Sequence, residues 1–393
     1  MSESTIKDRQ TKEALAPPLA ILAELTHRCP LQCAYCSNPL ELAAAREELS
    51  TEVWQRVIDE AAALGALQIH FSGGEPAARR DLEQLVRHAA AAGLYSNLIT
   101  SGVSLNRQRL AGLVEAGLDH IQLSFQDSEA ETAERIGNYR GAQARKLAFA
   151  GWVRESGLPL TVNAVVHRQN LDHLEDLLAL ALTLGASRIE IAHVQYYGWA
   201  LLNRRELMPT RSQLETANRI VAAARQRLSG RLVIDYVPPD YYAQRPKACM
   251  GGWGRMFINI SPTGRVLPCH AAETITDLHF DNVTERPLAD IWASSEAFQR
   301  FRGTGWMPEP CQSCERREID WGGCRCQALA LTGRADNTDP ACALSPEHSL
   351  ITQLALDDAE AEITAFVYRR PMRRAERPSA AAAVPAMSEP ASK

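Results

Sequence analysis

The sequence predicts an α/β fold in which six strands alternate with helices around a mostly parallel sheet, followed by a small cysteine-rich domain. Three observations predict it: helical segments that each end at a glycine, short apolar segments after those glycines, and seven of the ten cysteines in the last third of the chain. Alternating strands and helices form parallel sheets with right-handed crossovers. Six units favour a partial (β/α)6 barrel, similar to a TIM barrel that is not closed, and a doubly wound open sheet is the alternative.

Glycines mark the ends of the predicted helices, because a residue just after a helix often adopts the left-handed conformation. They predict helices over residues 51–64, 81–92, 106–116, 143–156 and 170–184. Each glycine is followed by a segment rich in apolar or β-branched side chains, which is typical of buried strands. The predicted strands cover residues 19–25, 67–71, 94–100, 120–125, 160–166 and 188–194.

Composition excludes several classes of protein. The chain has 393 residues, a net charge of −5 and 46% hydrophobic residues, without the clustered basic face that nucleic acid binding requires. Its most apolar window, residues 174–184, is too short for a membrane span of about 20 residues. The N-terminus has no secretory signal, so we expect a cytoplasmic protein. We expect a tail over residues 1–17, the barrel over 18–240, the cysteine-rich domain over 241–345, a helical segment over 346–372 and a disordered tail over 373–393.

The most informative motif is a cysteine trio, Cys29, Cys33 and Cys36, which directly follows the first predicted strand. Thiolates are the usual ligands of iron–sulfur clusters, and three of them leave one iron of a four-iron cube open. An open position on a metal can hold a substrate or cosubstrate. Zinc bound with His27 as fourth ligand, a disulfide framework and unrelated buried thiols are the alternatives.

A second motif, Gly73-Gly74-Glu75, follows the second predicted strand. In both candidate topologies the site lies at the C-terminal ends of the strands, so this loop and the cysteine trio share one rim. Paired glycines allow a backbone to approach a ligand closely, and the free carbonyls beside Glu75 suit a ligand ammonium group. A simple tight turn is the alternative interpretation.

Together these residues resemble the radical S-adenosylmethionine (SAM) superfamily, whose fold is a partial (β/α)6 barrel. The resemblance rests on Cys29, Cys33 and Cys36 with Tyr35 before the last of them, and on the glycine motif after the second strand. It implies a 4Fe-4S cluster whose open iron binds SAM and helps to generate a 5′-deoxyadenosyl radical. The SAM contacts that it implies are Gly73, Gly74 and Glu75 for the methionine amine, Tyr35 on the adenine side, and Ser124 and Asn163 for the ribose or carboxylate.

The C-terminal third indicates further metal sites, because so many thiols in a chain expected in the cytoplasm favour metal binding over disulfides. The cysteines are Cys249, Cys269, Cys311, Cys314, Cys324, Cys326 and Cys342, and a hairpin over residues 256–266 separates the first two. This region resembles the SPASM extension of peptide-modifying radical SAM enzymes, including the segment 288–292 before the pair Cys311 and Cys314.

Two four-ligand clusters need eight ligands, and seven cysteines are present. The family pattern has a further cysteine where this chain has Asp320, and a carboxylate can also bind iron. We therefore assign Cys311, Cys314, Asp320 and Cys342 to one auxiliary cluster and Cys249, Cys269, Cys324 and Cys326 to the other, the latter as a four-iron or a two-iron centre. The alternative for Asp320 is a solvated acid, with water or another group as ligand.

Within the superfamily, residues 18 to about 345 most resemble the PqqA peptide cyclases of pyrroloquinoline quinone (PQQ) biosynthesis. The supporting segments are residues 122–127 and 193–200, together with Asp320. The resemblance implies a carbon–carbon crosslink between a glutamate and a tyrosine of the PqqA peptide. It also implies the peptide chaperone PqqD and a flavodoxin-type electron donor as partners.

Direct support for a peptide substrate is limited to aromatic residues after the sixth strand. Tyr196, Tyr197 and Trp199 could line a pocket for a tyrosine, although packing is the commoner role, and His193 could assist deprotonation of the ring. Two alternatives stay open at this point. One is another SPASM peptide maturase, forming a thioether or oxidising serine or cysteine, and the other is a redox or zinc scaffold without catalysis.

Overall fold

The computed structural model describes residues 15–370, which are built on a single sheet of nine strands. The order is β7-β6-β5-β4-β3-β2-β1-β8-β9, and neighbouring strands are parallel except for β8 and β9. The strands are β1 (Ala20–Thr26), β2 (Gln68–Gly73), β3 (Tyr95–Thr100), β4 (His120–Phe125), β5 (Leu160–Val166), β6 (Arg188–His193), β7 (Val233–Val237), β8 (Phe257–Ile260) and β9 (Val266–Leu267).

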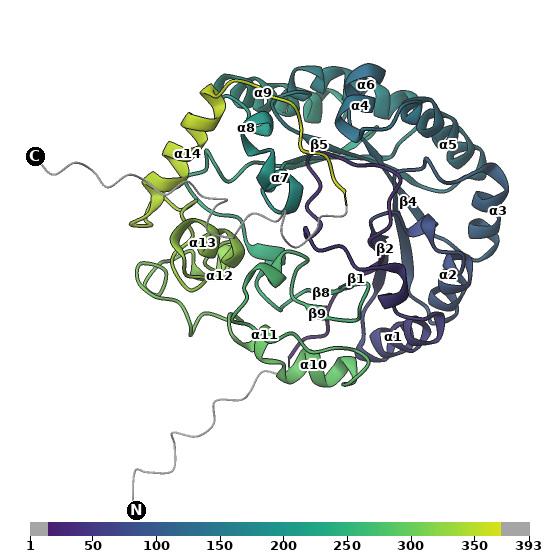
Figure 1. Ribbon diagram of the computed structural model, residues 1–393, viewed down its shortest axis with the longest axis horizontal. Helices are drawn as coiled ribbons and strands as arrows, with labels where there is room; N and C mark the ends of the chain where they lie inside the picture. The colour runs from purple at the N-terminus through teal and green to yellow at the C-terminus, as the bar shows by residue number, and fades with distance from the viewer. Residues whose placement is uncertain (1–14, 371–393) are drawn as a thin grey trace, which may run out of the picture.

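The first six strands are the six that the sequence predicts, in consecutive order. A doubly wound sheet would reverse its order at a switch point, so the partial barrel is confirmed and that alternative is wrong. Figure 1 shows the curved sheet with its helices along the outside. The helices of this part are α1 (Thr51–Leu64), α2 (Leu82–Ala91), α3 (Arg107–Glu115), α4 (Ala130–Gly137), α5 (Ala142–Ser156), α6 (Leu174–Thr183), α7 (Gly198–Leu202), α8 (Arg204–Leu207) and α9 (Arg211–Arg227).

Helix α1 illustrates why these segments form helices where they do. Its N-cap Ser50 accepts a hydrogen bond from the Val53 peptide N–H, and Gly65 ends the helix with φ of 94°. Between these ends Trp54, Val57 and Ile58 are fully buried against the sheet. This apolar face, shared by the neighbouring helices, forms the core between the helices and the outer face of the sheet.

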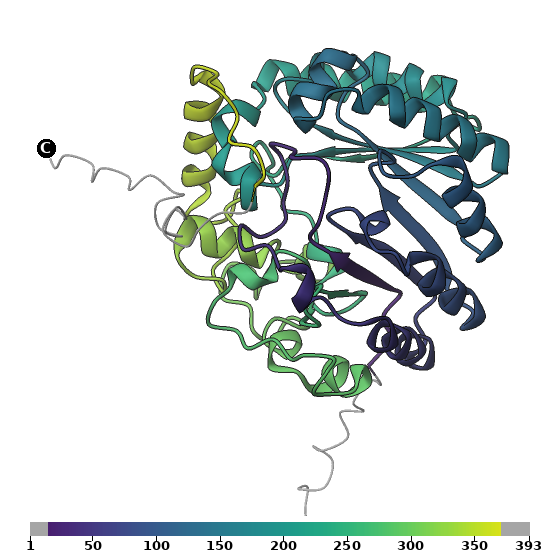
Figure 2. The same cartoon turned by 45° about the vertical axis from the view of Figure 1, so that its right-hand side comes forward.

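The cysteine-rich region begins inside this sheet. The predicted hairpin is confirmed as β8 and β9, but β8 also pairs in parallel with β1, from Ala20 opposite Phe257 to Ala23 opposite Ile260. The remaining helices are α10 (Leu288–Ser294), α11 (Glu296–Gln299), α12 (Arg317–Asp320), α13 (Arg325–Thr332) and α14 (His348–Glu360). After α14 the chain runs back over the mouth of the barrel (Figure 2).

No helix within residues 15–370 combines the length and the apolar character that a membrane crossing needs. The terminal tails that the sequence predicts fall almost entirely on residues 1–14 and 371–393, outside the described residues. They remain predictions.

Candidate active site and cysteine groups

A cavity of about 460 Å³ opens at the C-terminal ends of the barrel strands. Its walls contain all but one of the site residues that the sequence predicts for this rim. These are Cys29, Cys33, Tyr35, Cys36, Gly73, Gly74, Ser124 and Asn163. The cysteine trio and the glycine loop therefore meet as expected, and all ten cysteines of the chain are free thiols.

The cysteine loop is anchored to the barrel through its backbone. The Ala34 N–H donates to the Ile136 carbonyl oxygen at the end of α4 (3.1 Å), and the Asn203 side chain donates to the Ala34 carbonyl oxygen (2.8 Å). Burial raises the pKa of the Cys33 thiol to about 11, and the neighbouring Lys146 lowers it. A bound metal would keep such a thiol deprotonated, as ligation requires.

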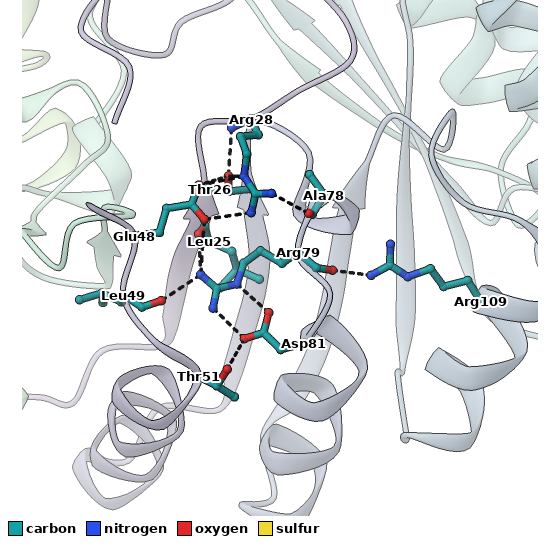
Figure 3. A network of polar contacts seen from close by, with 10 residues as sticks. All are labelled: Leu25, Thr26, Arg28, Glu48, Leu49, Thr51, Ala78, Arg79, Asp81 and Arg109. Carbon is teal, nitrogen blue, oxygen red and sulfur yellow. Dashed lines mark hydrogen bonds and ion pairs between the residues drawn. The ribbon is translucent and has the colours of Figure 1, made fainter. Parts of the chain in front are cut away.

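An ion-pair network fastens the start of the cysteine loop from outside the cavity (Figure 3). Arg28, next to Cys29, donates from Nε and Nη2 to the two carboxylate oxygens of Glu48 (3.1 and 3.0 Å) and from Nη1 to the Ala78 carbonyl oxygen (3.0 Å). Thr26 also donates to Glu48. The network thus joins the segment at the start of the cysteine loop to the segment that follows the glycine motif.

Arg79 forms the buried half of this network. Its guanidinium donates two hydrogen bonds to the Asp81 carboxylate (2.9 and 2.7 Å) and one to the Leu49 carbonyl oxygen (3.0 Å). Its Nη1 also lies 3.7 Å from the Glu48 carboxylate. Because only 7% of Arg79 is exposed, these contacts act in a medium where charges interact strongly.

The paired glycines also bring the glycine loop into contact with the cysteine loop, while Gly73 and Gly74 still line the cavity. The Gly74 N–H donates to the Thr26 carbonyl oxygen (2.6 Å), and the Glu75 N–H donates to the Arg28 carbonyl oxygen (2.8 Å). A Cβ on Gly73 would overlap the Thr26 carbonyl oxygen, and one on Gly74 would lie 2.5 Å from the Arg28 carbonyl oxygen. The absent side chains therefore let the two loops touch each other.

Glu75 is the one predicted SAM contact on this rim that is absent from the cavity wall. Its side chain is fully buried, and its carboxylate accepts hydrogen bonds from the Ala77 N–H (3.1 Å), the Thr100 hydroxyl (2.7 Å) and both the N–H and hydroxyl of Ser101. This carboxylate holds the glycine loop against the end of β3. Direct contact with a ligand amine is not what the arrangement favours.

The other predicted contacts line the cavity with partners of their own. The Tyr35 hydroxyl accepts a hydrogen bond from Gln126 (2.9 Å), and the Asn163 side chain donates to Glu190 (3.1 Å). Ser124 also lines the cavity, and its carbonyl oxygen accepts a hydrogen bond from Lys146 (2.8 Å).

His27 does not join the three thiols. Its Nδ1 accepts a hydrogen bond from the Ala43 N–H (2.9 Å), and it is not among the residues that line the cavity. In residues 15–370, no three His, Cys, Asp or Glu side chains converge as ligands do around a single metal ion. The thiolates of an iron–sulfur cube bind different iron atoms and need not converge on one point.

One predicted auxiliary group, called the first auxiliary group below, contains Cys249, Cys269, Cys324 and Cys326, and its four thiols form a ring of sulfur contacts. Cys249 contacts Cys269 and Cys324, and Cys326 contacts the same two thiols. The Tyr197 hydroxyl lies 3.0 Å from the Cys324 sulfur. Four thiols brought together in this way match the donor set that an iron–sulfur cluster requires.

The residues of the other predicted auxiliary group, called the second auxiliary group below, also come together. Cys311, Cys314, Asp320 and Cys342 all line one small cavity. Asp320 is only 8% exposed and lies 3.4 Å from the Arg316 guanidinium, while its other carboxylate oxygen accepts a hydrogen bond from the Gly322 N–H (3.3 Å). The solvated acid that was the alternative for Asp320 is not what the structure contains.

A second cavity, of about 240 Å³, adjoins the first. It is lined by Tyr196 and Tyr197 as expected, and by three thiols of the first auxiliary group, whereas Trp199 is fully buried outside it. Residues that line both cavities are His193, Gln195, Val237 and His270. The two cavities therefore meet between the cysteine loop and the four-thiol group.

Two families match the chain. The radical SAM superfamily matches residues 23–181, and SPASM, an iron–sulfur cluster-binding domain, matches residues 249–315. Among curated relatives, a PqqA peptide cyclase of Bradyrhizobium diazoefficiens is 61% identical over 364 residues, which are 92% of this chain and 96% of the relative. Another, of Gluconobacter oxydans, is 59% identical over 355 residues, 90% and 98% of the two chains.

The chain belongs to the PqqA peptide cyclase family. It is therefore a radical SAM enzyme with a SPASM iron–sulfur domain, as its motifs predict. Solved structures share the fold at low identity. Streptococcus suis SuiB bound to S-adenosylmethionine has a TM-score of 0.71 at 19% identity, covering 84% of this chain and 78% of SuiB. Native anSMEcpe with bound AdoMet and the Kp18Cys peptide has a TM-score of 0.61 at 15% identity, covering 87% of this chain and 96% of anSMEcpe.

In this member of the family, two buried cations beside the cysteine loop escaped the sequence reasoning. Lys146 on α5 is fully buried, and burial lowers its pKa to about 8 although the nearby Cys33 raises it. Arg369 comes from the end of the described chain and lines the first cavity. Lys146 follows the fourth strand in a regular helix, and Arg369 lies in a segment without a motif, so neither carries a local signal.

Proposed function

We propose that this enzyme cyclises the PqqA precursor peptide by joining a glutamate and a tyrosine side chain through a carbon–carbon bond, the first step of PQQ biosynthesis. The observation that carries the proposal is the pair of adjoining cavities, with the cysteine trio on one and the four-thiol group on the other. The proposal is also supported by relatives named PqqA peptide cyclase, which are about 60% identical to this chain and align with it over nearly their whole length.

The donor set of the first cavity fits a 4Fe-4S cluster with SAM. We propose that Cys29, Cys33 and Cys36 hold the cluster, that the Gly73 and Gly74 backbone faces the methionine group, and that Tyr35, Ser124 and Asn163 position the rest of SAM. When bound there, cluster and cofactor would supply the oxidising radical chemistry that removes a hydrogen atom from the glutamate γ-carbon.

The second cavity suits the tyrosine of the peptide. Its walls carry Tyr196, Tyr197 and Tyr241, and aromatic rings there can stack against a substrate ring. Forming the crosslink removes two hydrogen atoms from the peptide overall, the second as an electron and a proton. The four-thiol group on the same cavity allows the chain to hold an electron acceptor beside the substrate.

The partners follow from this chemistry and from the family. We propose that PqqD presents the peptide and that a flavodoxin-type protein delivers single electrons. We also place the enzyme in the cytoplasm, because ten free thiols that are to bind iron require reducing conditions.

The test is an anaerobic reaction of the reconstituted enzyme with PqqA, PqqD, SAM and a reductant. Mass spectrometry is expected to show loss of two hydrogen atoms from the peptide, with fragmentation assigning them to one glutamate and one tyrosine. Deoxyadenosine without a modified PqqA would leave another peptide maturase as the function. Failure to cleave SAM at all would favour the redox or zinc scaffold.

Asp320 gives a separate prediction for the second auxiliary group. We propose that its carboxylate is the fourth ligand beside Cys311, Cys314 and Cys342. Asp320→Cys is then expected to change the electron paramagnetic resonance spectrum of that cluster and lower its potential by on the order of 100 mV, because thiolate is the softer and stronger donor. The check is a potentiometric titration.

Glu318→Cys is the matched control, because Glu318 lies on the same short helix α12 and is exposed. It is expected to leave spectrum and potential unchanged. Identical spectra and potentials for wild type and Asp320→Cys would show that the carboxylate does not bind the cluster.

A further inference from the structure

The segment 361–370 returns from α14 and lies across the cysteine loop at the barrel mouth (Figures 1 and 2). Several contacts hold it there, including hydrogen bonds from Arg168 to the Ala361 carbonyl oxygen (2.9 Å) and from Thr364 to Glu206 (2.5 Å). Asn203 accepts from the Val367 N–H (2.7 Å) and donates to the Val367 carbonyl oxygen (2.8 Å), and the Tyr368 hydroxyl donates to the Arg135 carbonyl oxygen (2.9 Å). Asn203 is the same side chain that anchors Ala34, so one amide joins this segment to the cysteine loop.

Arg369 is the residue of this segment that enters the site. It is 6% exposed and lines the first cavity together with the three thiols. Its guanidinium donates to the His27 carbonyl oxygen and to the Cys36 sulfur, and it lies 5.9 Å from the centre of the Trp199 ring. Its positive charge also lowers the pKa of Cys29 and Cys33, against the larger effect of burial.

Among the described residues, the Arg369 guanidinium has no acidic partner. Within residues 15–370, no carboxylate lies within 4.0 Å of it, and its Nε is buried without a hydrogen-bond partner. A buried charge without a counter-charge is costly, so such sites are normally completed by an anion. A four-iron cube held by three thiolates is an anion, and it gains another negative charge when it accepts an electron.

We propose that Arg369 is the counter-ion of the cluster held by Cys29, Cys33 and Cys36, and that it favours both retention of the cluster and its reduction. The inference rests on the proposed assignment of these cysteines as ligands. No bond forms or breaks: one electron passes from an external donor such as dithionite to the cluster, and the fixed positive charge stabilises the added negative charge. Arg369 is thus a positioning residue, attached to the site by the C-terminal segment.

The test compares variants of the full-length reconstituted enzyme. Arg369→Gln is expected to lower the midpoint potential of the SAM-responsive cluster in a titration followed by electron paramagnetic resonance, and to release its iron to a chelator about tenfold faster. Arg369→Lys keeps the charge and is expected to retain most of the wild-type potential. Tyr368→Phe removes one contact of the segment, keeps the charge, and is expected to match wild type.

The inference would be overturned if Arg369→Gln left the midpoint potential and the rate of iron release unchanged. It would also be overturned if Arg369→Lys or Tyr368→Phe shifted the potential as much as Arg369→Gln does. Arg369→Leu removes the same charge and provides the same comparison if the glutamine variant does not fold. The wild type separates the two levels of proposal. It is expected to show a SAM-responsive cluster that is absent when Cys29, Cys33 and Cys36 are all replaced by alanine. If the wild type shows no such cluster, the failure is that of the proposed function and not of the role of Arg369.

Discussion

Replacing Cys33 with alanine is expected to reduce reductive cleavage of SAM by about a thousandfold or more, to the background of the assay. With only Cys29 and Cys36 left on the cavity wall, the loop lacks a ligand for a cube that keeps one iron open for SAM. Deoxyadenosine formed by the anaerobically reconstituted enzyme, separated by liquid chromatography, is the measurement.

The auxiliary groups provide the internal control for this variant. Their thiols lie elsewhere in the chain, so Cys33→Ala is expected to lose only the iron of one cluster and to unfold at nearly the wild-type temperature. Cleavage of SAM at the wild-type rate by Cys33→Ala would contradict the assignment of the trio as the radical-generating site.

Replacing Arg79 with methionine is expected to lower the free energy of unfolding by about 2–3 kcal/mol, because the Leu49 carbonyl oxygen and the nearly buried Glu48 carboxylate lose this guanidinium, and the partly exposed Asp81 carboxylate keeps only Thr51 as a donor. Methionine is long enough to fill much of the same space, so the effect reports the lost charge more than a cavity. Urea unfolding of the metal-free protein under reducing conditions measures it.

Arg80→Met is the matched control, since Arg80 is the next residue and is exposed. It is expected to stay within about 0.5 kcal/mol of wild type. If the two methionine variants were equally stable, the network of Figure 3 would not hold the cysteine loop in the way that its geometry indicates.

Local sequence signals predicted the barrel well, because each signal lies next to the element that it marks. Gly65 ends α1 in the left-handed conformation that its position implied, and β4 covers the predicted residues. Strand β7 and the placement of β8 beside β1 were missed. When two strands that are distant in the chain pair in a sheet, neither strand carries a sequence signal that identifies its neighbour.

In the site, too, features next to a local sequence signal were predicted, and contacts between distant residues were missed. The rim placement of Cys29 and Gly73 followed from strand ends, but the contact of the glycine loop with the cysteine loop did not, because the sequence does not show which loop a paired glycine lies against. Arg369 contacts His27 across 342 positions of the chain, beyond any motif. Asp320 was found through the missing cysteine of a family pattern rather than through any property of its neighbours.

The pairing of β8 with β1 also bears on the exposed edges of the sheet. Strand β1 has β2 on one side and β8 on the other, so the cysteine-rich region covers what would otherwise be a free sheet edge. An uncovered edge offers unpaired N–H and C=O groups to any other strand and promotes aggregation. Beyond carrying thiols, the cysteine-rich region thus covers an edge of the barrel sheet, and a barrel expressed without it is expected to aggregate more readily.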